Sequence, residues 1–106
     1  MDQLRAPEEY NYKVETQKVD IYSLGNIFYA ILTGENVFKN EDSDDVKNIV
    51  KEGGRPHIEE SMRLSTDRVD MALIKAMQMC HIQDPEKRAT ADQLKIFLAA
   101  ELVNLE

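Results

Sequence analysis

Residues 19–34 read VDIYSLGNIFYAILTG, which is the longest apolar run in the chain and ends at a glycine. Wound as a helix, this run carries apolar side chains on nearly every face, so it has to be surrounded by protein. It is too short and too polar to span a membrane, because Asp20 stands near one end and Asn26 lies in its middle. Gly34 is a natural helix terminator. The stretch therefore predicts a central buried helix around which the other elements pack.

The composition fits one globular domain over residues 1–106. Apolar residues make up 42% of the chain and charged residues 31%, which is enough for a packed core and a hydrated surface. The net charge of -7 argues against nucleic acid as the main partner, since binding to phosphates needs a basic patch. The acidic pairs at 41–42 and 44–45 are compatible with a basic peptide partner, although a solvated acidic surface is the simpler interpretation.

The cysteine and histidine content excludes several kinds of site. Cys80 is the single cysteine, so neither an intramolecular disulfide nor a cysteine-based metal cluster is expected. It follows Met77 and Met79 in a helical pattern, which indicates a core position for the thiol. Neither His57 nor His81 has a second ligand at metal-binding spacing. No signal peptide is apparent at the start, so the expected compartment is intracellular, by default the cytoplasm.

Four further segments have helical character. Pro7, followed by two glutamates, suits the first turn of a short helix. Ser43 is the expected N-cap of a helix over 44–51, whose apolar positions are Val46, Ile49 and Val50. Residues 11–18 and 35–42 are expected to be loops, and Val37 and Phe38 in the second are expected to pack onto the core. Residues 58–64 fit no pattern clearly.

The C-terminal half carries the two remaining predicted helices. A helix over 66–81, capped by Ser65 or Thr66, has an apolar stripe that Ile74 widens. The stripe consists of Val69, Leu73, Ala76, Met77 and Cys80. Residues 90–93 (TADQ) form a capping-box pattern ahead of a last helix over 91–101. No alternation typical of strands extends over five residues, so the prediction is an all-α fold of about five helices.

Three segments together resemble eukaryotic protein kinases. Ala6-Pro7-Glu8 resembles the Ala-Pro-Glu motif that closes the kinase activation segment. Residues 20–25 (DIYSLG) resemble Asp-x-Trp-Ser-x-Gly, which opens the central helix of the large lobe. Residues 84–90 (DPEKRAT) resemble Asp-Pro-x-x-Arg-Pro-Thr, the loop before the last helix of that lobe. The order and separation match the family, so the resemblance implies the C-terminal part of the large lobe, a partial kinase domain over the whole chain.

The resemblance implies roles for particular residues. Glu8 and Arg88 are expected to form a buried ion pair, with Tyr22, where the family usually has Trp, packed nearby. Asp20 matches an aspartate that holds the catalytic loop in the family, and in this chain it is equally explained as an acid at a helix N-terminus. Gly25 is expected to allow close approach of a neighbouring segment.

The segment before the first motif is implied to contact substrate. Gln3, Leu4 and Arg5 precede Ala6, and in the family this segment lies just past the phosphorylated residue. These residues match neither the usual serine/threonine pattern nor the usual tyrosine-kinase pattern. General resemblance favours a serine/threonine kinase.

The implied function is that of a complete parent domain, which transfers phosphate from ATP, with Mg²⁺, to protein hydroxyls. The 106-residue sequence contains no glycine-rich phosphate loop, catalytic-loop aspartate or Asp-Phe-Gly motif, so no catalytic, cofactor-binding or metal-binding residue is assigned and the chain alone is expected to be inactive. The expected partners are a protein substrate or regulator and the N-terminal part of the kinase domain. The alternative is a non-catalytic helical interaction module or pseudokinase remnant that binds a protein partner.

The resemblance also predicts that one face of the central helix is open. The family surrounds it with earlier helices that this sequence does not contain. One face, around Asp20, Ile27 and Ile31, is therefore expected to be open, and the chain is expected to be marginally stable or to self-associate.

Overall fold

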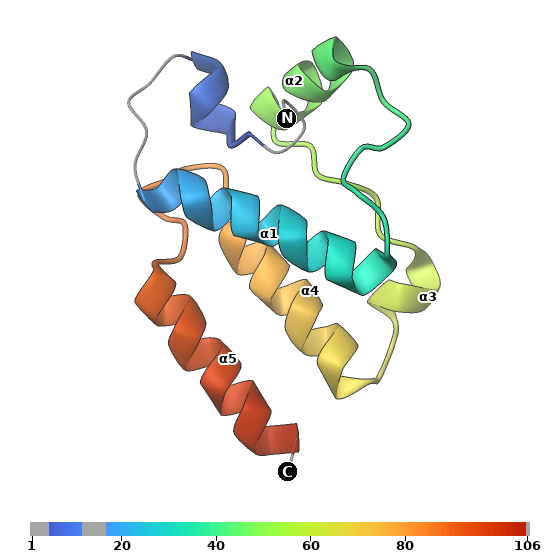
Figure 1. Ribbon diagram of the computed structural model, residues 1–106, viewed down its shortest axis with the longest axis vertical. Helices are drawn as coiled ribbons and strands as arrows, with labels where there is room; N and C mark the ends of the chain where they lie inside the picture. Colours follow the sequence, from blue (N-terminus) through green and yellow to red (C-terminus); the bar gives the residue numbers. More distant parts are fainter. Residues whose placement is uncertain (1–4, 12–16, 106) are drawn as a thin grey trace.

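The computed structural model describes residues 5–11 and 17–105, and every regular element in that part is helical (Figure 1). In chain order the elements are the 3-10 helix η2 (Pro7–Asn11) and the α-helices α1 (Gln17–Thr33), α2 (Ser43–Lys51), α3 (Glu60–Arg63), α4 (Arg68–Cys80) and α5 (Ala91–Leu105). The predicted all-α fold is confirmed. The loop predicted over 11–18 is shorter at both ends, because η2 reaches Asn11 and α1 begins at Gln17, and its middle lies outside the described residues.

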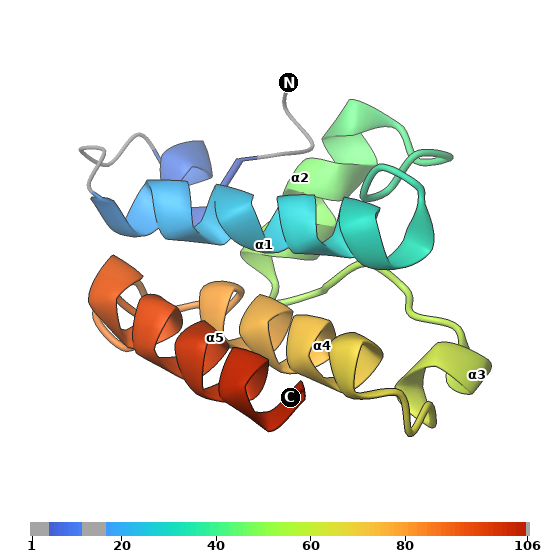
Figure 2. The same ribbon diagram turned by 60° about the horizontal axis from the view of Figure 1, so that its bottom comes forward.

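The helix α1 runs through the middle of the molecule, with η2 and α2 on one side and α4 and α5 on the other (Figures 1 and 2). Buried side chains tie α1 to each neighbour: Tyr22 packs with residues of η2 and α2, Ile21 with residues of α4 and α5, and Tyr29 with Val37 of the following loop. The expectation that Val37 packs onto the core is confirmed, because only 2% of it is exposed. Phe38 packs beside it, partly buried.

One face of α1 is open, as the sequence predicts. Ile27 is 52% exposed and Ile31 is 63% exposed, although both belong to the most apolar segment of the chain. Asp20 lies exposed at the start of the same helix. The helix ends at Thr33, and Gly34 follows in the left-handed conformation with φ 76°, which glycine adopts without a steric cost.

Three details of the predicted helix ends are wrong. The N-cap of α2 is Asp42, not Ser43, and its side chain makes no capping bond. The N-cap of α4 is Asp67, not Ser65 or Thr66, because its carboxylate accepts hydrogen bonds from the backbone N–H groups of two residues in the first turn. The helix thus begins at Arg68, two residues later than predicted.

The burial predicted for Val69 from the sequence pattern is also wrong. It was expected in the buried stripe of α4 but is 49% exposed. It lies in the first turn of α4, where that helix diverges from α1 in both views (Figures 1 and 2). Further along α4, where α1 crosses it, Ala76 and Cys80 are fully buried.

The capping box of α5 is confirmed in both directions. The backbone N–H of Thr90 donates to Gln93 Oε1 at 2.9 Å, and the N–H of Gln93 donates to Thr90 Oγ1 at 3.1 Å. The helix extends to Leu105 rather than ending at Glu101, since no glycine or proline interrupts residues 102–105. Within the described residues, no helix combines the length and apolar character needed to cross a membrane.

Candidate functional site

The predicted ion pair between Glu8 and Arg88 is present and deeply buried. Arg88 Nη1 donates to Glu8 Oε2 at 2.8 Å and Nη2 donates to Glu8 Oε1 at 2.9 Å, which gives two parallel bonds between planar groups. The Arg88 side chain is 0% exposed and that of Glu8 is 8% exposed. The pair joins η2 to the loop before α5 across 80 positions of sequence.

Backbone carbonyls accept the remaining donors of the Arg88 guanidinium. Nε donates to the carbonyl of Ile82 at 2.9 Å, Nη1 to that of Lys18 at 2.7 Å, and Nη2 to that of Gln83 at 3.2 Å. All five N–H groups of the side chain are therefore used. This completeness matters because a buried charge is stable only when its hydrogen-bonding capacity is satisfied.

The local structure of η2 and of the loop before α5 holds Glu8 and Arg88 in position. In η2, Pro7 begins the helix and the Glu9 carboxylate accepts a hydrogen bond from the N–H of Ala6, which is fully buried. In the loop before α5, the carbonyl of Asp84 accepts from the N–H of Arg88 at 3.0 Å and closes a turn. Lys18 of α1 holds that turn from outside, because its Nζ donates to the carbonyls of Pro85 and Arg88.

Two guanidinium groups lie close to the ring of Tyr22. The Cζ atoms of Arg88 and Arg55 lie 5.0 and 5.2 Å from the centre of its ring. Burial raises the pKa of Tyr22, which keeps the phenol protonated. The expected packing of Tyr22 near the ion pair is thus confirmed.

Arg55 is a residue that sequence reasoning missed. It lies in the segment between α2 and α3, where no helical or motif pattern marked it. Its Nε and Nη2 donate to the carbonyl of His81 at 2.8 and 2.5 Å, and Nη2 also donates to Gln83 Oε1 at 2.7 Å. Arg55 therefore attaches this segment to the same loop that carries Arg88.

Gly25 permits a close approach between α1 and the end of α4. A Cβ atom at this position would stand 2.6 Å from the His81 ring and 2.8 Å from Cys80 Cβ, distances that no real side chain adopts. The expectation of close approach at Gly25 is confirmed. Cys80 is buried, and burial raises the pKa of its thiol to about 11, so the thiol stays protonated as expected of a core residue.

His81 is buried without a partner for one ring nitrogen. Its ring centre lies 4.5 Å from that of Tyr22, and its Nε2 atom has no hydrogen bond. Burial, together with the positive charges of Arg55 and Arg88, lowers the pKa of His81 to about 3. The imidazole is consequently neutral at physiological pH.

Glu8, Arg88, Tyr22 and Arg55 are together called the clamp. Asp20 is exposed on the open face of α1. Arg5 is exposed just before Ala6, and the prediction that it contacts substrate stays a prediction. Gln3 and Leu4 lie outside the described residues.

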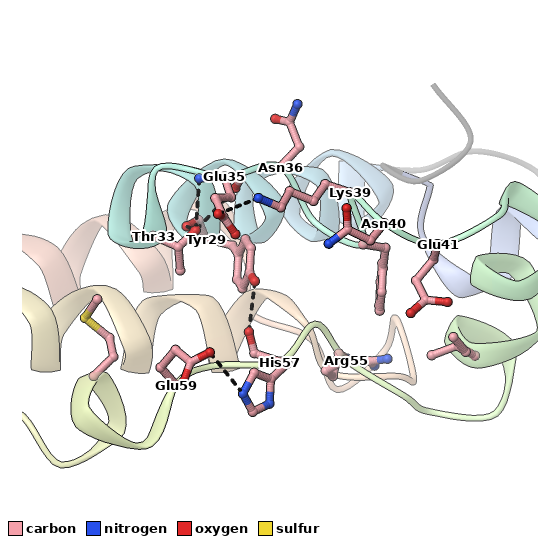
Figure 3. Close-up of a pocket in the computed structure, with 13 residues that line it drawn as sticks. Tyr29, Thr33, Glu35, Asn36, Lys39, Asn40, Glu41, Arg55, His57 and Glu59 are labelled. Carbon is pink, nitrogen blue, oxygen red and sulfur yellow. Dashed lines mark hydrogen bonds and ion pairs between the residues drawn. The ribbon is translucent and has the colours of Figure 1, made fainter.

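A pocket of about 620 Å³ opens between the C-terminal end of α1, the loop that follows it, α2 and the segment leading into α3 (Figure 3). The residues that line it are Tyr29, Thr33, Glu35, Asn36, Phe38, Lys39, Asn40, Glu41, Ile49, Arg55, His57, Glu59 and Met62. The Tyr29 hydroxyl donates to the carbonyl of His57 at 2.8 Å and joins two of its walls. Sequence reasoning did not identify this pocket, because its walls come from segments that are distant in sequence.

Across residues 5–11 and 17–105, no three histidine, cysteine, aspartate or glutamate side chains come together as metal ligands would.

The comparisons with known proteins agree with this geometry. The family description "Protein kinase domain" matches residues 2–96. Mitogen-activated protein kinase 12 of Homo sapiens is 43% identical over 65 residues, covering 59% of this chain and 18% of that protein. Serine/threonine-protein kinase STE20 of Candida glabrata is 34% identical over 89 residues, covering 84% of this chain and 9% of that protein.

Among solved structures, the twitchin kinase region from C. elegans superposes with a TM-score of 0.68 at 21% identity, covering 92% of this chain and 16% of that one. That structure supports the fold. The chain belongs to the protein kinase family, and it spans less than a fifth of the length of the two kinases named above.

Proposed function

We propose that this chain is the C-terminal part of the large lobe of a serine/threonine protein kinase domain. The complete domain would transfer the γ-phosphoryl group of ATP, with Mg²⁺, to a protein hydroxyl inside the cell. The observation that carries the proposal is the buried, two-bond contact between Glu8 and Arg88, since it joins the two motifs that define this part of the lobe. The serine/threonine assignment is supported by the names of relatives such as STE20.

In this proposal the clamp fixes the segment that meets the substrate. Ala6 is fully buried and Glu8 is held by Arg88, so the backbone entering η2 has a defined position relative to α1. Residues 3–5 immediately precede this anchor and would contact the substrate next to the acceptor hydroxyl. The role of the chain's own residues is thus to position the acceptor side of the reaction.

The described residues do not fit ATP–Mg²⁺. The sequence has no glycine-rich phosphate loop, and no three histidine, cysteine, aspartate or glutamate side chains come together among the described residues. No catalytic step is therefore derived for this chain, and the 106-residue protein alone is proposed to be inactive. Nucleotide, metal and catalytic base would be supplied by the preceding part of the domain.

A chimera provides the test. Residues 2–96 would replace the matching segment of the kinase domain of mouse serine/threonine-protein kinase PAK 1, a relative that is 32% identical over 89 residues. We expect the chimera to transfer labelled phosphate to a mixed protein substrate, and the chimera with Arg88→Ala to lose that activity. The isolated chain is the matched control, expected to give no transfer above the blank. A folded chimera without activity, or transfer by the isolated chain, would contradict the proposal.

A second candidate is a non-catalytic helical interaction module, or a pseudokinase remnant, that binds a protein partner. The observation in its favour is the exposed apolar face of α1 at Ile27 and Ile31, which a partner protein would cover. The coding sequence upstream of Met1 distinguishes the two. A catalytic loop and an Asp-Phe-Gly motif in frame favour the kinase, and a stop codon favours the module.

A further inference from the structure

Arg88 ends a short turn over residues 84–88, and the two ends of this turn are closed in different ways. The backbone N–H groups of Lys87 and Arg88 both donate to the carbonyl of Asp84 at 3.0 Å, and the Asp84 carboxylate accepts from the N–H of Glu86 at 2.9 Å. The start of the turn is therefore capped by one of its own residues, as at a helix N-terminus. A turn of this kind ends in carbonyl groups that have no partner within it.

Lys18, in the first turn of α1, supplies the partner for two of these carbonyls. Its Nζ atom donates to the carbonyl of Arg88 at 2.7 Å and to that of Pro85 at 2.9 Å. A positive charge is favourable at the carbonyl end of a turn, whereas in the first turn of α1 it opposes the dipole of its own helix. The presence of a lysine at this position is therefore better explained by the turn at 84–88 than by α1.

Lys18 also contacts Arg88 through its backbone. The Nη1 atom of Arg88 donates to the carbonyl of Lys18 at 2.7 Å and to Glu8 Oε2 at 2.8 Å. Lys18 thus holds Arg88 at both ends, because its ammonium group binds the backbone of Arg88 and its carbonyl binds the guanidinium. One continuous series of hydrogen bonds leads from α1 through Lys18 and Arg88 to Glu8 of η2.

We propose that Lys18 is a positioning residue for the protein substrate. Its ammonium group fixes the end of the turn at 84–88, the turn fixes the Arg88 guanidinium, and the guanidinium fixes Glu8 and the start of η2. The inference rests on the proposed function, in which the segment before η2 meets the acceptor side of the substrate. Lys18 touches no substrate itself and acts through Arg88. Loss of the ammonium group should loosen η2 and impair the use of the protein substrate, while the binding of nucleotide by the preceding part of the domain stays unchanged.

The first measurement is amide hydrogen exchange in the 106-residue protein, followed by NMR. The N–H of Ala6 is fully buried and bonded to the Glu9 carboxylate, and in Lys18→Met it is expected to exchange about tenfold faster because η2 opens more often. The N–H of Leu94 in α5, bonded within its own helix, is the internal reference and is expected to stay within about twofold. Lys87→Met removes the same charge at an exposed position of the same turn and is expected to leave both rates unchanged.

The second measurement uses the PAK 1 chimera and a serine peptide that the unmodified PAK 1 domain phosphorylates. Lys18→Met is expected to raise the KM for the peptide about fivefold or more and to leave the KM for ATP within about twofold. Lys18→Arg keeps the charge and several donors, so it is expected to recover most of this loss. A purely structural role would instead lower kcat through a smaller folded fraction and leave both KM values as they were.

Three results would overturn the inference. They are an unchanged exchange rate at Ala6 in Lys18→Met, an equal acceleration at Ala6 and Leu94, and an unchanged KM for the peptide in an active Lys18→Met chimera. A folded chimera that is inactive before any substitution contradicts the proposed function instead. The exchange measurement involves neither ATP nor phosphoryl transfer, so in that case it still decides whether Lys18 holds η2 in place.

Discussion

The two ends of α1 differ in how well the rest of the chain covers them. Near its start, Tyr22 is 2% exposed and contacts two arginines, one of which is the ion-paired Arg88 with all of its donors satisfied. Further along the same helix, Ile27 and Ile31 are more than half exposed, although their side chains are more apolar. Polar groups are therefore buried where the chain supplies partners, and apolar groups are exposed where it does not.

This contrast shows where the fold is complete. The residues of the clamp come from the first, middle and last thirds of the sequence, and hydrogen bonds of Arg88 and Arg55 link these segments within the described residues. The open face of α1 has the composition of a core and the exposure of a surface, which is the pattern of an interface.

The largest effect is expected at Arg88. Replacing it by alanine leaves the Glu8 carboxylate buried without its partner, which costs about 3–5 kcal/mol of the free energy of unfolding. Arg88→Lys keeps the charge but cannot form the two parallel bonds, so it is expected to be partly tolerated. Urea denaturation followed by circular dichroism measures both values. Lys87→Ala, at an exposed neighbour, is the control, and equal unfolding midpoints for all variants would contradict a structural role of the pair.

Gly25→Ala is expected to cost less. The added methyl group would collide with His81 and Cys80 at 2.6–2.8 Å, and overpacking of this kind costs about 1–3 kcal/mol. The better helix propensity of alanine returns at most about 1 kcal/mol. A net loss of about 1–2 kcal/mol in urea denaturation follows from the difference. Combining the change with His81→Ala should restore part of the loss, and a fully additive double variant would contradict contact between these residues.

Sequence reasoning recovered the features whose signals are local or belong to a known motif. The apolar run of α1, the capping box at Thr90 and the pairing of Glu8 with Arg88 are of this kind. It missed Arg55 and the unpartnered nitrogen of His81, because both depend on which distant segments meet in three dimensions. The predicted N-caps of α2 and α4 were wrong because several neighbouring polar residues can cap the same helix, and the sequence alone does not show which of them does.

His81 should make stability depend on pH. Its folded pKa is about 3 and its ordinary value is 6.5, so below about pH 6.5 the unfolded state binds a proton that the folded state does not. Stability is then lost as pH falls from about 6.5 toward 3, at up to about 1.4 kcal/mol per pH unit. In His81→Leu this part of the pH dependence should disappear. At pH 7 the stability should change little, because the variant removes the unpaired nitrogen and also the hydrogen bond between the imidazole and the backbone of Tyr22. Parallel curves of stability against pH for the two proteins would contradict this assignment.

The smallest effect on stability is expected on the open face. Replacing Ile27 and Ile31 together by serine removes apolar side chains that are already half exposed, so the free energy of unfolding should change by only about 0.5 kcal/mol per site. Self-association should nevertheless fall clearly, because these side chains form the apolar surface that a second molecule would cover. Sedimentation velocity over a range of protein concentrations measures the change. Substituting serine for Leu64, 70% exposed in the turn after α3, provides the comparison. An original protein that stays monomeric at every concentration, or variants that associate equally, would show that the open face of α1 is not the site of contact.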